Sequence, residues 1–179
     1  HFMFVGYSSQ FTTMPLYVVD RGGEIWQIGI VIGSFGVVSL IVRPFGGRWI
    51  YHVGPKRVAI AGTAIIGISN LLYMAVTSVW WLVPVRALQG IGMAIGPVAT
   101  STIVANLAPA NRRAEAMAYM GNSIASSGLY SPVVAFMLLA AYGFQATFLF
   151  SAACAFLGVA LAIGISGAQT GVPRGETST

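Results

Sequence analysis

The chain has 179 residues, of which 56% are hydrophobic and only 7% are charged, against roughly 25% charged residues in an ordinary soluble domain. Its 9 Lys+Arg and 4 Asp+Glu residues are too few to cover a globule in water, and the mean hydropathy of +0.80 agrees. This composition excludes an ordinary soluble globule and predicts an all-α integral membrane protein.

Long apolar runs predict six membrane-spanning helices, because a helix needs about 20 apolar residues to cross the hydrocarbon layer. In chain order the runs cover residues 2–19, 25–45, 58–76, 81–107, 116–141 and 146–165. Turn-forming and charged residues fill the segments between them, 20–24, 46–57, 77–80, 108–115 and 142–145. We expect one six-helix bundle over residues 1–166.

The two ends of the chain have the character of a piece of a longer protein. His1 opens an apolar stretch that lacks a basic leader or a small-residue cleavage site. The last residues change to Gly, Ser, Thr, Pro and charge, as in a linker. We therefore expect residues 167–179 to begin a cytoplasmic central linker.

Basic residues alternate between successive loops and predict the orientation of the chain. Arg48, Lys56 and Arg57 lie in the second loop, and Arg112 and Arg113 lie in the fourth. Loops rich in Lys and Arg stay in the cytoplasm. We therefore expect a multi-pass protein of the cell inner (plasma) membrane, with both ends of this segment cytoplasmic. Aromatic residues expected at the outer interface gather at the opposite helix ends: Trp26, Trp80, Trp81, Tyr142 and Phe144.

The residues needed for enzyme chemistry, metal binding or nucleic-acid binding are not present in recognisable patterns. There is no HExxH, Gly-x-Ser-x-Gly or Walker loop. Cys154 is alone, His1 and His52 are far apart, and the basic residues lie between apolar runs instead of on one polar face. We expect no enzyme, no metal, no cofactor and no nucleic acid. All four acids lie at or beyond helix ends: Asp20, Glu24, Glu115 and Glu176.

Arg86 is the outlier, because it lies about 9 Å into the predicted fourth span by helical rise. An arginine at that depth costs about 2.5 kcal/mol or more, so it is a functional candidate. The alternative is structural: the side chain reaches back to the outer interface or binds backbone carbonyls. By depth, Asp20 is the nearest candidate counter-ion, and an Arg86–Asp20 pair is our hypothesis.

Polar residues form stripes along the first and fourth spans. Tyr7 and Gln10 lie on one side of the first span, and Gln89 and Met93 extend the Arg86 face of the fourth. With Asp20, these residues are candidates for a substrate or proton path, but polar stripes also join helices to one another. The sequence is compatible with both interpretations, a path and a contact between helices. The third and sixth spans are almost uniformly apolar, and we expect them to face lipid or to be packed.

The segment 43–57 resembles a known loop signature. It reads RPFGGRWIYHVGPKR and is similar to the loop between helices two and three of the major facilitator superfamily, usually Gly-x-Leu-Ala-Asp-Arg-x-Gly-Arg-Lys. Gly47, Gly54 and Lys56 match that form. Tyr51 stands where the family places Asp, and His52 where it places the following Arg.

Further matches follow in the expected order. Residues 86–92, RALQGIG, resemble the Arg-x-x-Gln-Gly-x-Gly motif of helix four in the same superfamily. Residues 109–116, PANRRAEA, are similar to a Pro-x-x-Arg-Arg-x-Glu-Ala stretch of its sugar-efflux and drug-efflux branches. The charged positions of that loop are Arg112, Arg113 and Glu115. Pro15-Leu16-Tyr17 also fits these branches.

The resemblance implies the N-terminal six-helix half of a twelve-helix secondary transporter. In such a fold two bundles rock about a central cavity, and each bundle is a 3+3 inverted repeat whose first and fourth helices line the cavity. It also implies a gating loop whose Asp balances nearby basic residues, a carboxylate that Tyr51 cannot supply. The gating-loop candidates are Arg43, Gly47, Arg48, Tyr51, Gly54, Lys56 and Arg57.

The resemblance leads us to expect secondary active efflux of a small organic solute by alternating access, coupled to protons. In the resembled motif the helix-four arginine is linked to proton transfer, although it could instead orient an anionic substrate. Antiporters of the superfamily often carry a Gly-Pro pair followed by two glycines in helix five, but residues 131–136 keep only Pro132. This difference weakens the assignment as an antiporter. The expected partners are the bilayer, the solute, protons and a C-terminal six-helix half. The alternatives are a uniporter or uptake carrier, and a non-transporting scaffold or receptor.

Overall fold

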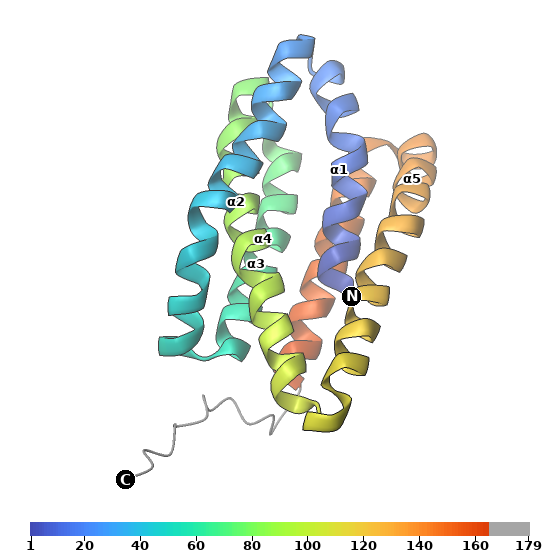
Figure 1. The fold of residues 1–179 in the computed structure, drawn as a ribbon. Helices are drawn as coiled ribbons and strands as arrows, with labels where there is room; N and C mark the ends of the chain where they lie inside the picture. Colours follow the sequence, from blue (N-terminus) through green and yellow to red (C-terminus); the bar gives the residue numbers. More distant parts are fainter. Residues whose placement is uncertain (165–179) are drawn as a thin grey trace.

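The computed structural model describes residues 1–164, and all of its regular structure is helical (Figure 1). In chain order the helices are α1 (Phe2–Asp20), α2 (Ile25–Val53), α3 (Pro55–Ala75), α4 (Val79–Leu107), the short 3-10 helix η1 (Ala110–Arg112) and α5 (Arg113–Gly164). The all-α prediction is confirmed. The expected linker at 167–179 lies outside the described residues.

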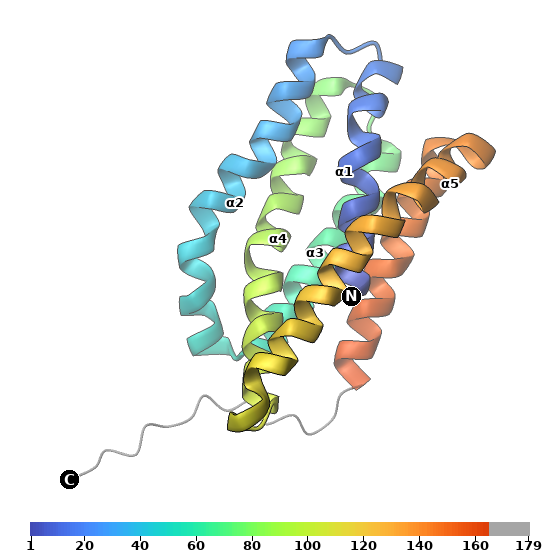
Figure 2. The same cartoon turned by 45° about the vertical axis from the view of Figure 1, so that its right-hand side comes forward.

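Helix α5 consists of two helical arms that meet at Gly143. That residue has φ 80° and ψ −175°, a combination open essentially only to glycine. The arms before and after it run in opposite directions beside each other (Figure 2). The break predicted at 142–145 is therefore present as a single strained residue and not as a loop.

The junction between α2 and α3 differs from the prediction. The segment 46–57 was expected to be a loop, but α2 continues to Val53 and α3 begins at Pro55. Gly54, at φ 91°, makes the whole turn, and Pro55 is well suited to a first helical position. With 29 residues, α2 is about 43 Å long and is longer than the hydrocarbon layer is thick. Its polar last turns can therefore stay helical outside that layer. Pro44 lies within this helix.

Four helical segments among the described residues are long and apolar enough to cross a membrane: Ile25–Val53, Pro55–Ala75, Val79–Leu107 and Ala110–Gly164. The first helix, α1, is less apolar, because its inner face carries Ser9, Gln10 and Thr13, all fully buried. The protein is thus a multi-pass helical bundle.

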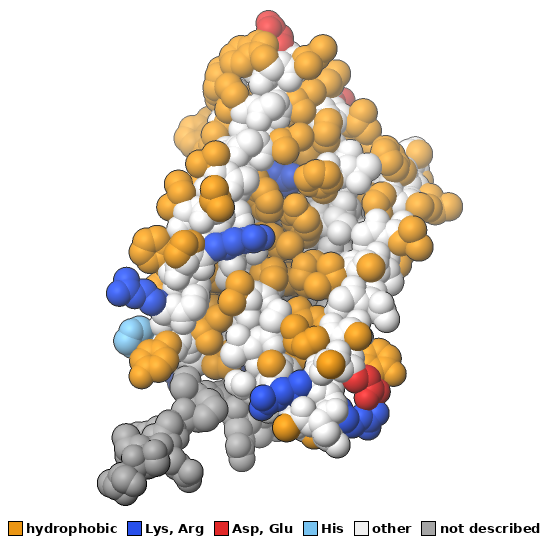
Figure 3. All heavy atoms as spheres, in the orientation of Figure 1, with side chains coloured by type: hydrophobic (Ala, Val, Ile, Leu, Met, Phe, Trp, Pro, Cys, Tyr) orange, Lys and Arg blue, Asp and Glu red, His pale blue; other side chains and the backbone are white. Residues whose placement is uncertain are grey.

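The connections between helices lie at two opposite ends of the bundle (Figures 1 and 2). The α2–α3 turn, the α4–α5 connection and the end of α5 are at one end, while the α1–α2 turn, the α3–α4 connection and Gly143 are at the other. The first residues of α1 lie partway along the bundle instead of at either end. Hydrophobic side chains cover most of the face seen in Figure 3.

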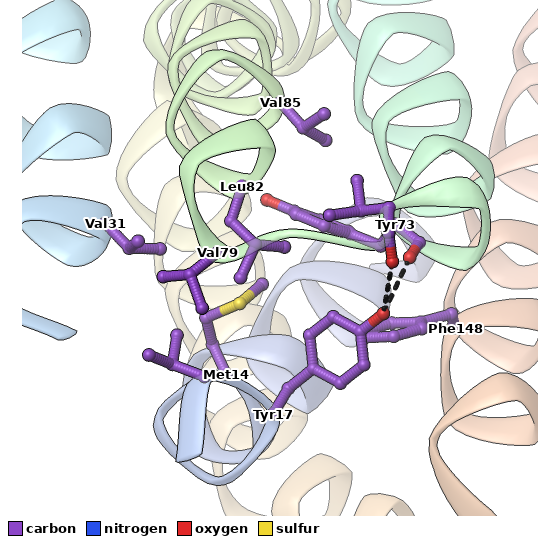
Figure 4. Packing of buried hydrophobic residues seen from close by; sticks show 10 residues of the cluster. Met14, Tyr17, Val31, Tyr73, Val79, Leu82, Val85 and Phe148 are labelled. Carbon is purple, nitrogen blue, oxygen red and sulfur yellow. Dashed lines mark hydrogen bonds between the residues drawn. The ribbon is translucent and has the colours of Figure 1, made fainter. Parts of the chain in front are cut away.

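Helix α4 packs against α2, α3 and α5, and α1 packs mainly against α5. Close approach of α3 and α4 depends on glycine: a Cβ on Gly92 would lie 2.6 Å from the Gly62 carbonyl oxygen. One apolar cluster joins α1, α2, α3, α4 and α5, and it includes Met14, Tyr17, Val31, Tyr73, Leu82 and Phe148 (Figure 4). This packing fixes the positions of the polar residues on α1, α3 and α4.

Candidate functional site

Arg86 lies in the interior of the bundle, and none of its side-chain surface is exposed. It occupies the third turn of α4, where neighbouring helices surround it on the inner side. Its Nη1 donates a hydrogen bond to Oε1 of Gln89, 2.5 Å away and three residues further along the same helix face. The Arg86 side chain therefore does not reach the outer interface, as one alternative had it.

Gln89 connects Arg86 to two other helices. Its Nε2 donates to Gln10 Oε1 of α1 at 3.1 Å and to Asn70 Oδ1 of α3 at 3.2 Å. Its Oε1 also accepts a hydrogen bond from the Tyr73 hydroxyl of α3 at 3.2 Å. Every donor and acceptor position of this amide is thus in use. We call Gln10, Asn70, Tyr73, Arg86 and Gln89 the polar cluster, and all five are fully buried.

An aromatic pair from α1 and α2 borders the polar cluster. The Arg86 guanidinium carbon is 5.1 Å from the ring centroid of Phe35, within the range of a cation–π contact. Tyr7, half-buried on α1, stacks on Phe35 with ring centroids 5.3 Å apart. The arginine therefore contacts side chains of α2 and α4, and its partner Gln89 reaches α1 and α3.

The polar cluster has more donors than acceptors. Arg86 Nε and Nη2, Gln10 Nε2 and Asn70 Nδ2 are buried and have no hydrogen-bond partner within the described residues. No carboxylate of the described chain pairs with Arg86. A buried donor without an acceptor costs about 1–3 kcal/mol. The arrangement therefore suits an oxygen acceptor, and a negatively charged one in particular.

The Arg86–Asp20 pair is not formed in the structure. Asp20 ends α1 and is exposed to solvent, whereas Arg86 is enclosed. Asp20 instead borders a cavity of about 280 Å³ at the Gly143 end of the bundle, which Tyr17, Phe144 and Phe148 also line. Depth along a helix was a poor guide to pairing, because it says nothing about which way each side chain points.

Near this cavity, Tyr17 links α1 to the end of α3. Its hydroxyl donates to the Tyr73 carbonyl oxygen at 3.0 Å and accepts a bond from Arg21 Nη2 at 2.8 Å (Figure 4 for the first contact). Arg21 therefore has an uncharged partner at the helix end. The contact fixes the C-terminal end of α1 against α3.

Met93 does not join the polar cluster. It is half-buried and packs against the apolar group that contains Met3, Phe4, Ile66 and Ala155. The stripe predicted along α4 is thus polar at Arg86 and Gln89 and apolar one turn later. Met93 contributes packing between α1, α4 and α5.

The gating-loop candidates lie in the second half of α2, in the α2–α3 turn and in the first turn of α3. Arg43, Gly47, Arg48 and Arg57 are exposed, and Gly54 forms the turn described above. Tyr51 is 69% exposed and its ring meets that of His52 edge-on, with centroids 5.3 Å apart. Lys56 Nζ donates to the carbonyl oxygen of Ile163 at the end of α5, at 3.2 Å.

The connection between α4 and α5 carries a local ion pair. Arg112 Nε and Nη2 donate to the two carboxylate oxygens of Glu115, both at 2.8 Å, and this contact raises the pKa of Arg112. Both side chains are largely exposed, so the pair adds little stability. Arg113 is exposed beside it.

Sequence reasoning missed the contribution of α3. Asn70 and Tyr73 are fully buried in the polar cluster, although the third span was expected to be almost uniformly apolar and to face lipid or be packed. The available signal was their three-residue spacing, which places both on one face of a helix. An Asn in an otherwise apolar span is rarely placed against lipid.

Comparison with known proteins agrees with this architecture. The model of a family described as the Major Facilitator Superfamily matches residues 1–178. Among similar proteins, Multidrug resistance protein 2 of Bacillus subtilis is 28% identical over 154 residues, covering 86% of this chain and 38% of the relative. An MFS-type transporter of Methanocaldococcus jannaschii is 32% identical over 84% of this chain and 38% of its own length.

A third relative is the quinolone resistance protein NorA of Staphylococcus aureus, which is 22% identical over 73% of this chain and 34% of its own length. The chain therefore spans little more than a third of the length of these relatives.

Proposed function

The chain belongs to the major facilitator superfamily, and from that premise we propose that it acts in secondary active efflux of a small organic solute across the plasma membrane. Family membership and the transporter names of the relatives indicate a transporter and not an enzyme. Two of the relatives reported above are named for multidrug or quinolone resistance, which favours a lipophilic organic solute.

In this proposal the helices α1 to α4 and the two arms of α5 are six spans, arranged as a 3+3 inverted repeat. The reversal at Gly143 supports the division of α5. A second six-helix half, outside this chain, completes a twelve-helix fold around a central cavity. The ends that carry Arg48 and Arg112 face the cytoplasm, and the contact between the Trp26 and Trp80 rings, 5.9 Å apart, belongs to the outer interface.

The observation that carries the proposal is the enclosed Arg86. A permanent positive charge at depth, with two buried N–H positions lacking an acceptor among the described residues, is retained in membrane proteins mainly for function. A carboxylate that enters the polar cluster in one conformation would have its pKa lowered there by Arg86. The pKa of this carboxylate would return to its ordinary value when movement of the two bundles separates it from Arg86. Proton uptake and release would then follow the alternation of access.

In this proposal the other candidate residues support Arg86, the path and the gate. Gln89 orients the guanidinium by a hydrogen bond, Gln10 in turn accepts a hydrogen bond from Gln89, and Tyr7 lines the path next to Phe35. Asp20, at the outer end, lies at the mouth of the path. The α2–α3 turn near Tyr51 takes part in gating at the cytoplasmic end.

The test uses the full-length gene product in proteoliposomes with an imposed pH gradient. We expect export of at least one member of a panel of lipophilic cations, quinolones and sugars, and loss of export when a protonophore collapses the gradient. Flux that ignores the gradient would favour a uniporter or uptake carrier. A folded protein that moves no solute would favour the scaffold or receptor alternative.

A further inference from the structure

A groove on the side of the bundle has no part in the proposed transport path. Helices α2 and α3 diverge from their turn at Gly54, and both pack on α4. Between them lies a cavity of about 360 Å³. Its walls are formed by Trp49, Val53, Arg57, Val58, Ala61, Ile65, Ile91 and Ile95. Every lining side chain except that of Arg57 is apolar.

Arg57 places an available charge at this groove. Its side chain is exposed and makes no hydrogen bond or ion pair with any residue in the described part of the chain. Its neighbours in the same region are different, since Lys56 donates to the Ile163 carbonyl oxygen and Arg112 is bound by Glu115. The groove therefore combines an apolar lining with one guanidinium that has no hydrogen-bond or ion-pair partner among residues 1–164.

The position of the groove restricts what can occupy it. Trp49 and Val53 on its α2 wall are 44% and 48% exposed, and the outer faces of spanning helices meet acyl chains. The groove borders the α2–α3 turn, since Val53, Arg57 and Val58 line it. The turn lies at the same end of the bundle as the α4–α5 connection (Figure 1), which carries Arg112 and Arg113, and headgroups are expected at such a basic end. An occupant with a long apolar part and an anionic head matches both the lining and the charge.

We propose that this groove is a binding site for an anionic phospholipid, with one acyl chain between α2 and α3 and the phosphate at Arg57. A planar guanidinium binds phosphate oxygens in a bidentate manner. Basic side chains next to a membrane select anionic headgroups. The site is separate from the polar cluster, and although Arg57 is also one of the gating-loop candidates, the test below measures lipid contact and not transport.

Trp49 provides a local probe of the site. In the full-length protein, every other tryptophan is replaced by phenylalanine, and the protein is placed in nanodiscs of phosphatidylcholine with a small share of acyl-brominated lipid. Bromine quenches tryptophan only at contact. We expect brominated phosphatidylglycerol to quench Trp49 at about fivefold lower mole fraction than brominated phosphatidylcholine, as expected for one basic contact at a membrane surface.

Matched variants separate a specific site from a diffuse charge effect. Arg57→Gln should remove the preference for phosphatidylglycerol, Arg57→Lys should retain part of it, and Arg113→Gln, an exposed arginine that does not line the groove, should leave it unchanged. Equal quenching by the two lipids, or equal effects of both Gln variants, would overturn the proposal. Absence of quenching by either lipid would also overturn it, because the groove would then be covered by protein.

Discussion

The side chains of Gln10 and Gln89, 79 residues apart in the sequence, are joined by a hydrogen bond of 3.1 Å in the interior of the bundle. The bond connects α1 to α4, and through Gln89 it also reaches Arg86. Each partner is fully buried. The two glutamines therefore act as one structural unit.

We expect replacement of these glutamines to be non-additive. Gln89→Leu removes the hydrogen-bond acceptor that Arg86 has among residues 1–164 and takes away the side-chain partner of Tyr73, at about 1–3 kcal/mol for each group left without a partner. Gln10→Leu removes a single interhelical bond, worth about 0.6–2 kcal/mol in a membrane protein. Thermal unfolding in detergent should show that the double variant loses less than the two single variants together. Strict additivity would mean that the bond is not formed.

The glycine contact between α3 and α4 gives a prediction about packing. Gly92→Ala would place a Cβ 2.6 Å from the Gly62 carbonyl oxygen and 2.9 Å from Ile66 Cγ1. Separation of the two helices should destabilise the protein by about 1–3 kcal/mol. Gly33→Ala is the matched control, because nothing lies within 4 Å of its added Cβ. Equal melting temperatures for the two variants would contradict the close approach.

At Gly143 the effect of backbone conformation can be measured separately from steric clashes. A Cβ at this position meets nothing within 4 Å, but the φ of 80° is unfavourable for alanine. Gly143→Ala should therefore cost about 1–3 kcal/mol through the backbone alone. Gly128→Ala, in the first arm of the same helix and equally free of neighbours, should be neutral or stabilising. Equal stability of the two variants would mean that α5 does not turn at Gly143.

Much of this architecture was predictable from sequence, because apolar length and glycine or proline punctuation are local properties. The start of α1, the ends of α4 and the turn near Gly143 all lie within a few residues of the predicted positions. The continuation of α2 to Val53 was not predicted, since a helix outside the hydrocarbon layer has no apolar signature. The polar residues after Phe45 were therefore interpreted as a loop, although they belong to the last turns of α2.

The site was predictable only in part. Arg86, Gln89 and Gln10 stood out because polar groups are rare in spans, and the structure brings them together. The role of Asn70 and the exposure of Asp20 depend on how α1 and α3 rotate about their axes. That rotation is set by packing against other helices, a property that periodicity within one helix does not contain.

The α2–α3 turn gives a prediction about gating. Tyr51 is exposed near the end of α2, in a segment that also carries Arg48, Lys56 and Arg57, in the place where the resembled family signature has Asp. Tyr51→Asp should change the balance between outward-open and inward-open forms by about five- to thirtyfold, the range for a contact worth about 1–2 kcal/mol. Cysteine accessibility from the outer side measures the shift. Tyr119→Asp, 67% exposed on α5, is the control, and an unchanged balance in Tyr51→Asp would exclude a gating role for this position.

The most direct test of the account is the effect of Arg86→Gln on gradient-driven export by the full-length protein, with solute flux and internal pH recorded together. A hydrogen bond to a charged group is worth about 1.5–3 kcal/mol, so we expect export to fall by roughly tenfold to hundredfold. Solute-induced proton movement should fall with it, while Arg113→Gln keeps both at wild-type levels. Export and proton movement that survive Arg86→Gln in a folded protein would make Arg86 structural and contradict the central claim.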